Sequence, residues 1–271
     1  MDNRAIGVFD SGLGGLTTVK ELRRLLPYEN IVYLGDTGRV PYGTRGRETI
    51  QKYAMQDMAF LQSHNVKMII AACGTASSAI TSEMTSHLGV PFSGVVLPAA
   101  QAACASSISG RIGVIGTTAT VRSGAYGRAV RGINPDARVF GSACPLFVPL
   151  VENGFIQPDN EITIKVARIY LEPIIKFETD TLILGCTHYP IIYDILNQLL
   201  DYKVTLIDPG KEVARWAHSY LISEDMLSSS QQKGGCEFFV TDAPDSFSST
   251  ADIFLGEHVD SQVTQIDLEA I

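Results

Sequence analysis

Short segments that are apolar at almost every position alternate with longer helix-like segments along all 271 residues of the chain. Continuous apolarity of this kind is typical of parallel strands whose sheet is covered by helices on both faces. The alternation therefore predicts an α/β fold with parallel-type sheets. We expect strands at 5–9, 31–35, 68–72, 92–96, 111–116, 137–141, 181–184 and 203–207. We expect helices at 15–26, 47–64, 75–88, 124–132, 160–178 and 191–200.

Two pairs of similar segments recur at nearly the same offset. The tripeptide IGV occurs at 6–8 and again at 112–114, and the segment MIIAACGT at 68–75 is similar to TLILGCTH at 181–188. Apolar strands that end in small residues recur in many α/β proteins, and that explanation is sufficient for either pair alone. Two pairs in the same order favour two similar α/β halves that face one another.

The composition excludes several classes of protein. Hydrophobic residues make up 45% of the chain and charged residues 18%, which is enough apolar material for a large core and excludes dominant disorder. The net charge is −8 and no run of Lys or Arg exceeds two residues, so we expect no nucleic-acid partner. The N-terminus has no leader pattern, and no apolar run approaches the ~20 residues of a membrane span. We therefore expect a soluble, cytoplasmic protein without a membrane partner.

The cysteines and histidines do not form a structural framework. The five cysteines are odd in number and contain no C-x-x-C, so we expect no disulfides. The histidines lack the spacing of a zinc site, and we expect no metal. Cys104, Cys144 and Cys236 are interpreted as core or surface residues.

Cys73 and Cys186 have a more informative context, since each ends an apolar strand and precedes a helix. Ligands of open α/β sheets bind at the carboxyl ends of strands, where a helix N-terminus favours a thiolate. We expect Thr75 to cap the first of these helices and Pro190 to lie in the first turn of the second. A single cysteine in this place usually only packs, but two in matching positions predict a functional pair.

The loop DSGLGG at 10–15 also joins a strand to a helix. It fails the nucleotide pattern G-x-G-x-x-G because Thr17 occupies the last position. One interpretation is that its glycines allow close approach of a small ligand or of the opposite half. Ser11 and backbone amides would then bind a carboxylate, and Asp10 would bind an ammonium or orient a base. The alternative, a tight turn with Asp10 as a cap, is equally consistent with this segment.

Two further segments carry weaker signals. Pro41, Tyr42 and Gly43 form a rigid turn after the segment DTG at 36–38. His188 follows Cys186 by two residues and could relay a proton near neutral pH, although most histidines in such places are packing residues.

Taken together, the motifs resemble those of glutamate racemases, within the aspartate/glutamate racemase superfamily. The histidine of the motif at 185–190 points to the glutamate enzymes rather than to their aspartate relatives. The motifs, which cover nearly the whole chain, are FDSGLGGL at 9–16, DTGRVPYG at 36–43, ACGTA at 72–76, VVLPA at 95–99, CPLFVPLVENG at 144–154, GCTHYP at 185–190, FFVTD at 238–242 and FLG at 254–256.

The resemblance implies interconversion of L- and D-glutamate without a cofactor, which supplies D-glutamate for peptidoglycan, the cell wall and cell shape. It also implies two similar, facing α/β domains related by a pseudo-twofold axis, with the active site in the cleft between them. The first domain would contain 1–97 plus 208–271, and the second 98–207. The expected partner is the small-molecule substrate glutamate, and a homodimer is an arrangement that the family allows.

The resemblance also assigns roles to residues. Cys73 would take the proton from D-glutamate and Cys186 the proton from L-glutamate. Asp10, His188 and Glu152 would assist proton transfer. The substrate-binding positions would be Asp10, Ser11, Pro41, Tyr42, Gly43, Gly74, Thr75, Thr187 and His188.

One residue departs from the family pattern. Gly74 stands where the family usually has asparagine, whose side chain could hydrogen-bond the substrate. Loss of a hydrogen bond to a charged group costs ~1.5–3 kcal/mol, so we expect weaker substrate affinity. Gly74→Asn should then lower the KM for glutamate, provided that the loop accepts a side chain. Two alternatives remain open at this point: a related racemase with another acid as substrate, and a catalytically silent binding protein.

Overall fold

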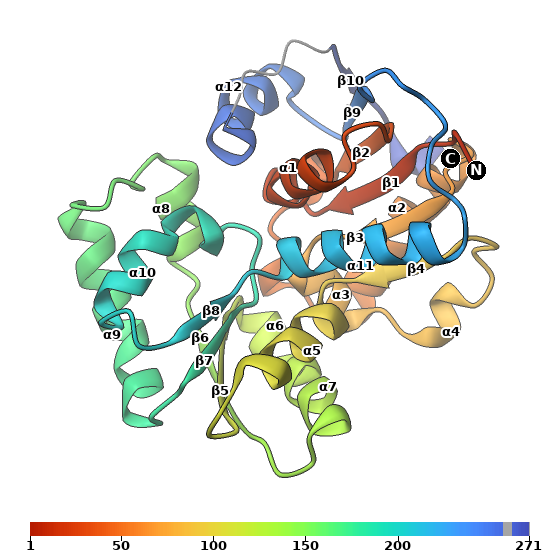
Figure 1. Ribbon diagram of the computed structural model, residues 1–271. Coiled ribbons are helices and arrows are strands. Elements are labelled where there is room, and N and C mark those ends of the chain that lie inside the picture. The colour runs from red at the N-terminus through yellow and green to blue at the C-terminus, as the bar shows by residue number, and fades with distance from the viewer. Residues whose placement is uncertain (257–261, 271) are drawn as a thin grey trace.

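Two parallel β-sheets, each covered by helices on both faces, form the molecule (Figure 1). The computed structural model describes residues 1–256 and 262–270, so His258 lies outside the described residues. No helix within these two ranges is long and apolar enough to cross a membrane. The prediction of an α/β fold with parallel-type sheets is confirmed.

The first sheet has six strands in the order β10-β9-β2-β1-β3-β4, and the second has four in the order β6-β5-β7-β8. All pairs within both sheets are parallel. The strands of the first sheet are β1 (Ile6–Asp10), β2 (Ile31–Gly35), β3 (Met68–Ala71), β4 (Phe92–Gly94), β9 (Cys236–Val240) and β10 (Val263–Gln265). Those of the second are β5 (Arg111–Gly116), β6 (Arg138–Ala143), β7 (Thr181–Leu184) and β8 (Thr205–Ile207).

The internal repeat predicted from the sequence is present in the topology. Four strands of the first sheet have the order β2-β1-β3-β4, and the whole second sheet has the equivalent order β6-β5-β7-β8. The registers agree as well, because Gly7 of β1 lies beside Ile69 of β3 and Gly113 of β5 lies beside Leu182 of β7. Cys73 and Cys186 therefore follow equivalent strands.

Helices cover both faces of each sheet. One face of the first sheet packs against α1 (Leu16–Leu25), α11 (Pro209–Ser223) and α12 (Pro244–Leu255). Its other face packs against α2 (Arg47–Ser63) and α3 (Gly74–Ala79). On the second sheet, α5 (Val96–Ser106) and α7 (Ala125–Ile133) cover one face, and α8 (Phe147–Glu152), α9 (Glu161–Lys176) and α10 (Tyr193–Leu199) cover the other. The remaining helical segments are α4 (Ser82–Thr85), α6 (Thr118–Ser123), η1 (Thr37–Arg39), η2 (Tyr42–Thr44), η3 (Tyr189–Ile192) and η4 (Leu268–Ala270).

The continuous apolarity of the strands is explained by this double cover. Along β5, Ile112 and Val114 pack toward α5 and α7, whereas Ile115 belongs to the core cluster on the other face. Each such side chain contributes about 1.5–3 kcal/mol when it is withdrawn from water, so neither face of the strand can be polar.

Some elements differ from the sequence-based expectation. The helix expected at 75–88 is two short helices, α3 and α4. Thr81 is the N-cap of α4, because its side chain accepts a hydrogen bond from the Met84 N–H. Helices α5 and α11 had not been predicted as such. The strand expected at 92–96 ends at Gly94, and α5 begins two residues later.

Candidate active site

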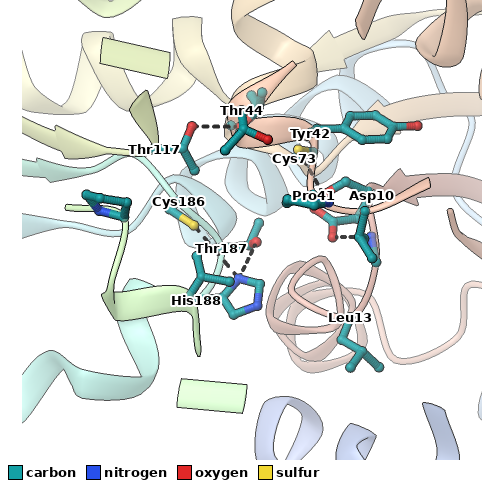
Figure 2. Close-up of a pocket in the computed structure, with 18 of the residues that line it drawn as sticks. Asp10, Leu13, Pro41, Tyr42, Thr44, Cys73, Thr117, Cys186, Thr187 and His188 are labelled. Carbon is teal, nitrogen blue, oxygen red and sulfur yellow. Dashed lines mark hydrogen bonds between the residues drawn. The ribbon is translucent and has the colours of Figure 1, made fainter. Parts of the chain in front are cut away.

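A cavity of about 350 Å³ lies where the carboxyl ends of the two sheets face one another (Figure 2). Its volume is in the range of small-molecule sites. Every site residue predicted from the sequence lines it, namely Asp10, Ser11, Pro41, Tyr42, Gly43, Cys73, Gly74, Thr75, Glu152, Cys186, Thr187 and His188. In Figure 2, Cys186 and His188 lie on one side of the cavity, and Asp10, Pro41 and Cys73 lie on the other.

Asp10 is the last residue of β1 and is buried. Its Oδ2 accepts the Gly12 N–H at 3.0 Å, whereas Oδ1 has no partner among the described residues. Gly15 is the N-cap of α1, and its N–H stabilises the Asp10 carboxylate, which agrees with the interpretation of Asp10 as a cap of this turn. Burial raises the pKa of the Asp10 carboxyl, although the charge of His188 opposes the shift. Oδ1 of Asp10 is thus a buried acceptor without a hydrogen bond, in a residue that lines the cavity.

Cys73 is itself the N-cap of α3, the position that had been expected for Thr75. Its Sγ accepts the Ala76 N–H at 3.4 Å and lies 3.5 Å from Ser11 Oγ. Burial and the charge of Asp10 raise the pKa of the Cys73 thiol to about 12. The helix N-terminus acts in the expected direction, because the Ala76 N–H lowers the pKa of Cys73, but burial and the charge of Asp10 outweigh it.

Cys186 belongs to a hydrogen-bonded chain of three side chains. His188 Nδ1 lies 3.8 Å from Cys186 Sγ, and His188 Nε2 lies 2.9 Å from Glu152 Oε1. Burial disfavours the charged imidazolium, but the bonds to Cys186 and Glu152 outweigh it and raise the pKa of His188 to about 10. A protonated His188 therefore lies next to the Cys186 sulfur at the cavity wall. Pro190 lies in the first turn of η3, as expected.

Tyr42 faces away from the cavity with its hydroxyl group (Figure 2). That hydroxyl donates to Asp36, and it lies 3.1 Å from Asp57 Oδ2. Arg39 joins the same two carboxylates, through Nε to Asp36 at 2.6 Å and through a terminal nitrogen to Asp57 at 3.1 Å. Both aspartates are fully buried. This cluster fixes the loop that lines the cavity; the sequence analysis missed Asp57, which carries no motif signal.

Other lining residues were also missed. Thr117 follows β5 as Ser11 follows β1, so the internal repeat could have identified it. Its hydroxyl lies 3.0 Å from that of Thr75, which connects the two halves. The lining residues that the sequence analysis did not assign are Gly12, Leu13, Val40, Thr44, Thr117, Thr118, Pro145, Val148 and Pro149.

Glycines allow the two halves to meet closely beside the cavity. A Cβ at Gly14 would overlap Thr187 and lie 2.7 Å from His188 Nδ1. A Cβ at Gly74 would overlap the carbonyl oxygen of Gly185 and lie 3.1 Å from its carbonyl carbon. The interpretation that the glycines of the DSGLGG loop allow approach of the opposite half is supported at Gly14. The sequence analysis expected Gly74→Asn to lower the KM for glutamate only if the loop accepts a side chain. The loop has no room for one, so this requirement is not met.

The lining chemistry suits a small zwitterionic acid. No Lys or Arg is among the described residues that line the cavity, so carboxylates would be bound by hydroxyls and backbone N–H groups. Asp10 and Glu152 could bind an ammonium group. Within the described part of the chain, no three His, Cys, Asp or Glu residues are arranged to hold a metal ion.

Known proteins share both the sequence and the fold. Residues 15–217 match the Asp/Glu/hydantoin racemase family. A glutamate racemase from Geobacter metallireducens is 42% identical over 267 residues, which cover 98% of each chain. The crystal structure of glutamate racemase from Francisella tularensis in complex with D-glutamate is 38% identical, with a TM-score of 0.92 over 100% of both chains. The glutamate racemase from Thermus thermophilus in complex with β-chloro-D-alanine is 43% identical, with a TM-score of 0.90 over 100% of both chains.

The matches to the three glutamate racemases cover 98–100% of both chains. A shared fold alone would not indicate an activity, but sequence identity at this level over whole chains does. The chain therefore belongs to the Asp/Glu/hydantoin racemase family and, within it, to the glutamate racemases, which are amino-acid racemases and hence isomerases.

Proposed function

We propose that the chain interconverts L- and D-glutamate by proton transfer between two cysteines, Cys73 and Cys186, without a cofactor. The observation that carries this proposal is the placement of the two thiols. Each follows the equivalent strand of one half, and both line the same cavity. Inversion of Cα requires one base on each face of the substrate, and two facing copies of one structural unit provide this arrangement.

In the direction from L- to D-glutamate, the Cys186 thiolate takes the Cα proton and becomes a thiol. The Cys73 thiol then gives its proton to the opposite face of the carbanion and becomes a thiolate. The raised pKa of Cys73 and the protonated His188 beside Cys186 agree with this starting state. The reverse direction requires the opposite state, in which Cys73 is the thiolate.

The other proposed roles concern binding and proton supply. Asp10 has one free carboxylate oxygen and would hold the substrate ammonium or orient Cys73. His188 and Glu152 would carry the proton that Cys186 exchanges with solvent. The hydroxyls of Ser11, Thr75 and Thr187, together with backbone N–H groups of Gly43 and Gly74, would bind the two carboxylates. In a site that excludes water these donors also stabilise the carbanion.

We further propose that the D-glutamate formed supplies peptidoglycan synthesis and so contributes to cell-wall formation and cell shape. This role depends on the family resemblance. The domain boundaries inferred from it, at residues 97/98 and 207/208, remain predictions. Limited proteolysis that released a fragment cut near these residues would support them.

The mechanism is tested by incubating L-glutamate in D2O with the wild-type chain, with Cys73→Ser and with Cys186→Ser. Proton NMR follows loss of the Cα proton, and circular dichroism follows the enantiomer. Two bases place deuterium in the early D-glutamate while the remaining L-glutamate keeps its proton. Both serine variants should lose most racemisation, because serine is far less acidic than cysteine.

Cys104→Ser is the matched control, since Cys104 lies outside the cavity. It should racemise glutamate at the wild-type rate. Near wild-type activity of Cys73→Ser would refute the two-cysteine mechanism, as would early D-glutamate that retained the original proton. Activity that required added pyridoxal phosphate, or that was abolished by EDTA, would refute the absence of a cofactor.

A further inference from the structure

Two fully buried aspartates lie behind the loop that lines the active-site cavity. Asp36 directly follows β2, and Asp57 lies within α2. The hydroxyl of Tyr42 contacts both of them and points away from the cavity (Figure 2). Asp36, Asp57 and Arg39 are not among the described residues that line the cavity, so the proposed mechanism gives them no chemical role.

This cluster pairs two acids with one guanidinium group. Arg39 reaches both acids, through Nε to Asp36 Oδ2 at 2.6 Å and through a terminal nitrogen to Asp57 Oδ1 at 3.1 Å. If both acids were ionised, the charge of Arg39 would balance only one of them. A buried charge without a partner is costly, and two carboxylates that share one site raise the pKa of one of them strongly. One of the two acids should therefore hold a proton.

The number of hydrogen atoms indicates which acid holds it. The Tyr42 hydroxyl contacts Asp36 Oδ2 and lies 3.1 Å from Asp57 Oδ2, but a hydroxyl has only one hydrogen to donate. Its second contact is a hydrogen bond only if the acid donates to the Tyr42 oxygen. Asp36 also accepts from Arg39 and, at 2.9 Å, from the Thr241 hydroxyl, so both of its oxygens act as acceptors. Asp57 Oδ2 has no such second donor among the described residues, which favours Asp57 as the acid that donates.

The electrostatic surroundings of Asp57 agree with this count. Burial raises the pKa of Asp57, and the charges of Asp36 and Asp10 raise it further. The charge of Arg39 and the bond to Tyr42 lower it, but the net shift is well upward.

We propose that Asp57 is a neutral carboxylic acid at neutral pH and that it positions the loop 41–43 by donating a hydrogen bond to the Tyr42 oxygen. Tyr42 donates in turn to Asp36, whose charge Arg39 balances. Asp57 is a positioning residue, since it acts on the substrate only through Tyr42. Its protonation is independent of the function proposed above; only the effect on glutamate binding rests on that function.

The loop connects this cluster to the proposed substrate site. Pro41, Tyr42 and Gly43 line the cavity. Gly43 also packs against the second half, because a Cβ there would lie 2.9 Å from the Thr117 side chain. Loss of the bonds to Tyr42 would displace the Gly43 N–H, which we propose binds a substrate carboxylate. The expected effect is a higher KM for glutamate with little change in kcat.

Infrared spectroscopy of the full chain in D2O at pH 7 tests the protonation, because a neutral carboxylic acid and a carboxylate absorb at different frequencies. The wild type should have an acid band that Asp57→Asn removes, and the difference spectrum separates it from the bands of all other carboxyl groups. Tyr42→Phe should shift this band, since it removes the acceptor of the Asp57 proton. Asp136→Asn is the matched control, because Asp136 is exposed and the substitution changes the net charge equally. It should leave the band unchanged.

Racemisation kinetics of two asparagine variants test the positioning role. Asparagine imitates a neutral aspartic acid, because its amide nitrogen can donate to Tyr42 and its oxygen can accept from Arg39. Asp57→Asn should therefore keep the wild-type KM for glutamate. Asp36→Asn should raise the KM by about 10- to 100-fold, the effect of one hydrogen bond to a charged group, because it removes the carboxylate that Arg39 and Tyr42 share.

The outcomes separate this proposal from the function on which its kinetic part rests. An acid band that Asp57→Asn removes would support the neutral acid even if the chain did not racemise glutamate. Identical infrared spectra of the wild type and Asp57→Asn in the acid region would overturn the proposal. A KM that rises in Asp57→Asn and stays at the wild-type value in Asp36→Asn would also overturn it, because the proton would then lie on Asp36.

Discussion

Gly74 stands at the position where the resemblance to the family leads us to expect asparagine, and the structure predicts the effect of Gly74→Asn. A Cβ there would lie within 3.0 Å of the Gly185 carbonyl oxygen and 3.1 Å from its carbon, whereas ordinary contacts begin at 3.4 Å. Both partners are backbone, so neither can rotate away. Overpacking of this kind costs about 1–3 kcal/mol.

The strain would fall on the segment that carries the second thiol, because Gly185 directly precedes Cys186. We expect Gly74→Asn to raise the KM for glutamate and to lower kcat/KM by about 5- to 150-fold, the equivalent of 1–3 kcal/mol. This expectation replaces the one drawn from the sequence, in which the asparagine amide gained a hydrogen bond to the substrate. Gly74→Ala should have a similar effect, since it introduces the same Cβ without an amide.

Initial rates of racemisation from both enantiomers, followed by circular dichroism, would measure the effect. Urea unfolding would show how much of the strain destabilises the fold. Gly132→Ala is the control, because a Cβ at this helical position meets nothing within 4 Å. It should keep full activity and raise stability by up to about 1 kcal/mol. A lower KM for Gly74→Asn with unchanged stability would refute the reasoning and mean that the two halves separate at little cost.

Three other predictions concern buried charges. The pKa of His188 is raised from 6.5 to about 10. The free energy of unfolding that His188 adds relative to His188→Gln should therefore be complete below pH 6.5 and disappear as the pH rises through 10. Urea unfolding at pH 6 and pH 10.5 measures this, and the same difference between the two proteins at both pH values would contradict it. Tyr42 and Arg39 both contact Asp57, and an asparagine keeps a hydrogen-bonding side chain for them whereas an alanine does not. Asp57→Asn should therefore keep glutamate affinity, whereas Asp57→Ala should raise KM and lower stability by about 1–3 kcal/mol. Equal losses in both variants would contradict this reasoning. Glu29→Ala should destabilise the fold by about 3–5 kcal/mol, because it leaves the fully buried Lys67 ammonium without the carboxylate that lies 2.6 Å away. A decrease of less than about 1 kcal/mol in the free energy of unfolding, measured by thermal unfolding, would contradict this.

Much of the fold could be predicted because the strands have a distinctive pattern. Strands β1, β2, β3, β5, β6 and β7 were all expected within a few residues. Five of them are almost wholly buried, whereas β6 is partly exposed. Helices α5 and α11 were missed for a physical reason. Helix α5, VLPAAQAACAS, is nearly all apolar or small, so no polar face produces a helical period. Helix α11 begins at Pro209. In the sequence a proline at this place indicates a turn, but it is also favoured as the first residue of a helix.

The candidate site was predictable to the extent that its residues stand in motifs at strand ends. Asp10 is the last residue of β1, and Cys73 and Cys186 each come two residues after a strand. Parallel strands bring such residues to one edge of the sheet. Asp57 could not be found in this way, because it lies within α2 and meets Tyr42 and Arg39 only after folding. For Cys73, the sequence indicates the helix N–H group that favours a thiolate, but it does not show the burial and the Asp10 charge that outweigh it.

The two halves share a strand order, yet the surroundings of their cysteines differ. Cys73 lies beside the carboxylate of Asp10 and the hydroxyl of Ser11, neither of which carries positive charge. Cys186 lies beside His188, which is paired with Glu152. In the proposed mechanism, an exact repeat would give both thiols the same surroundings, and neither would be favoured as the first base. The sequence difference between the halves would therefore bias which thiol acts first. Because racemisation by two cysteines requires both states, we expect the substrate to reduce the difference when it binds. The ammonium of glutamate beside Asp10 would do so, because it compensates the charge that now raises the pKa of Cys73.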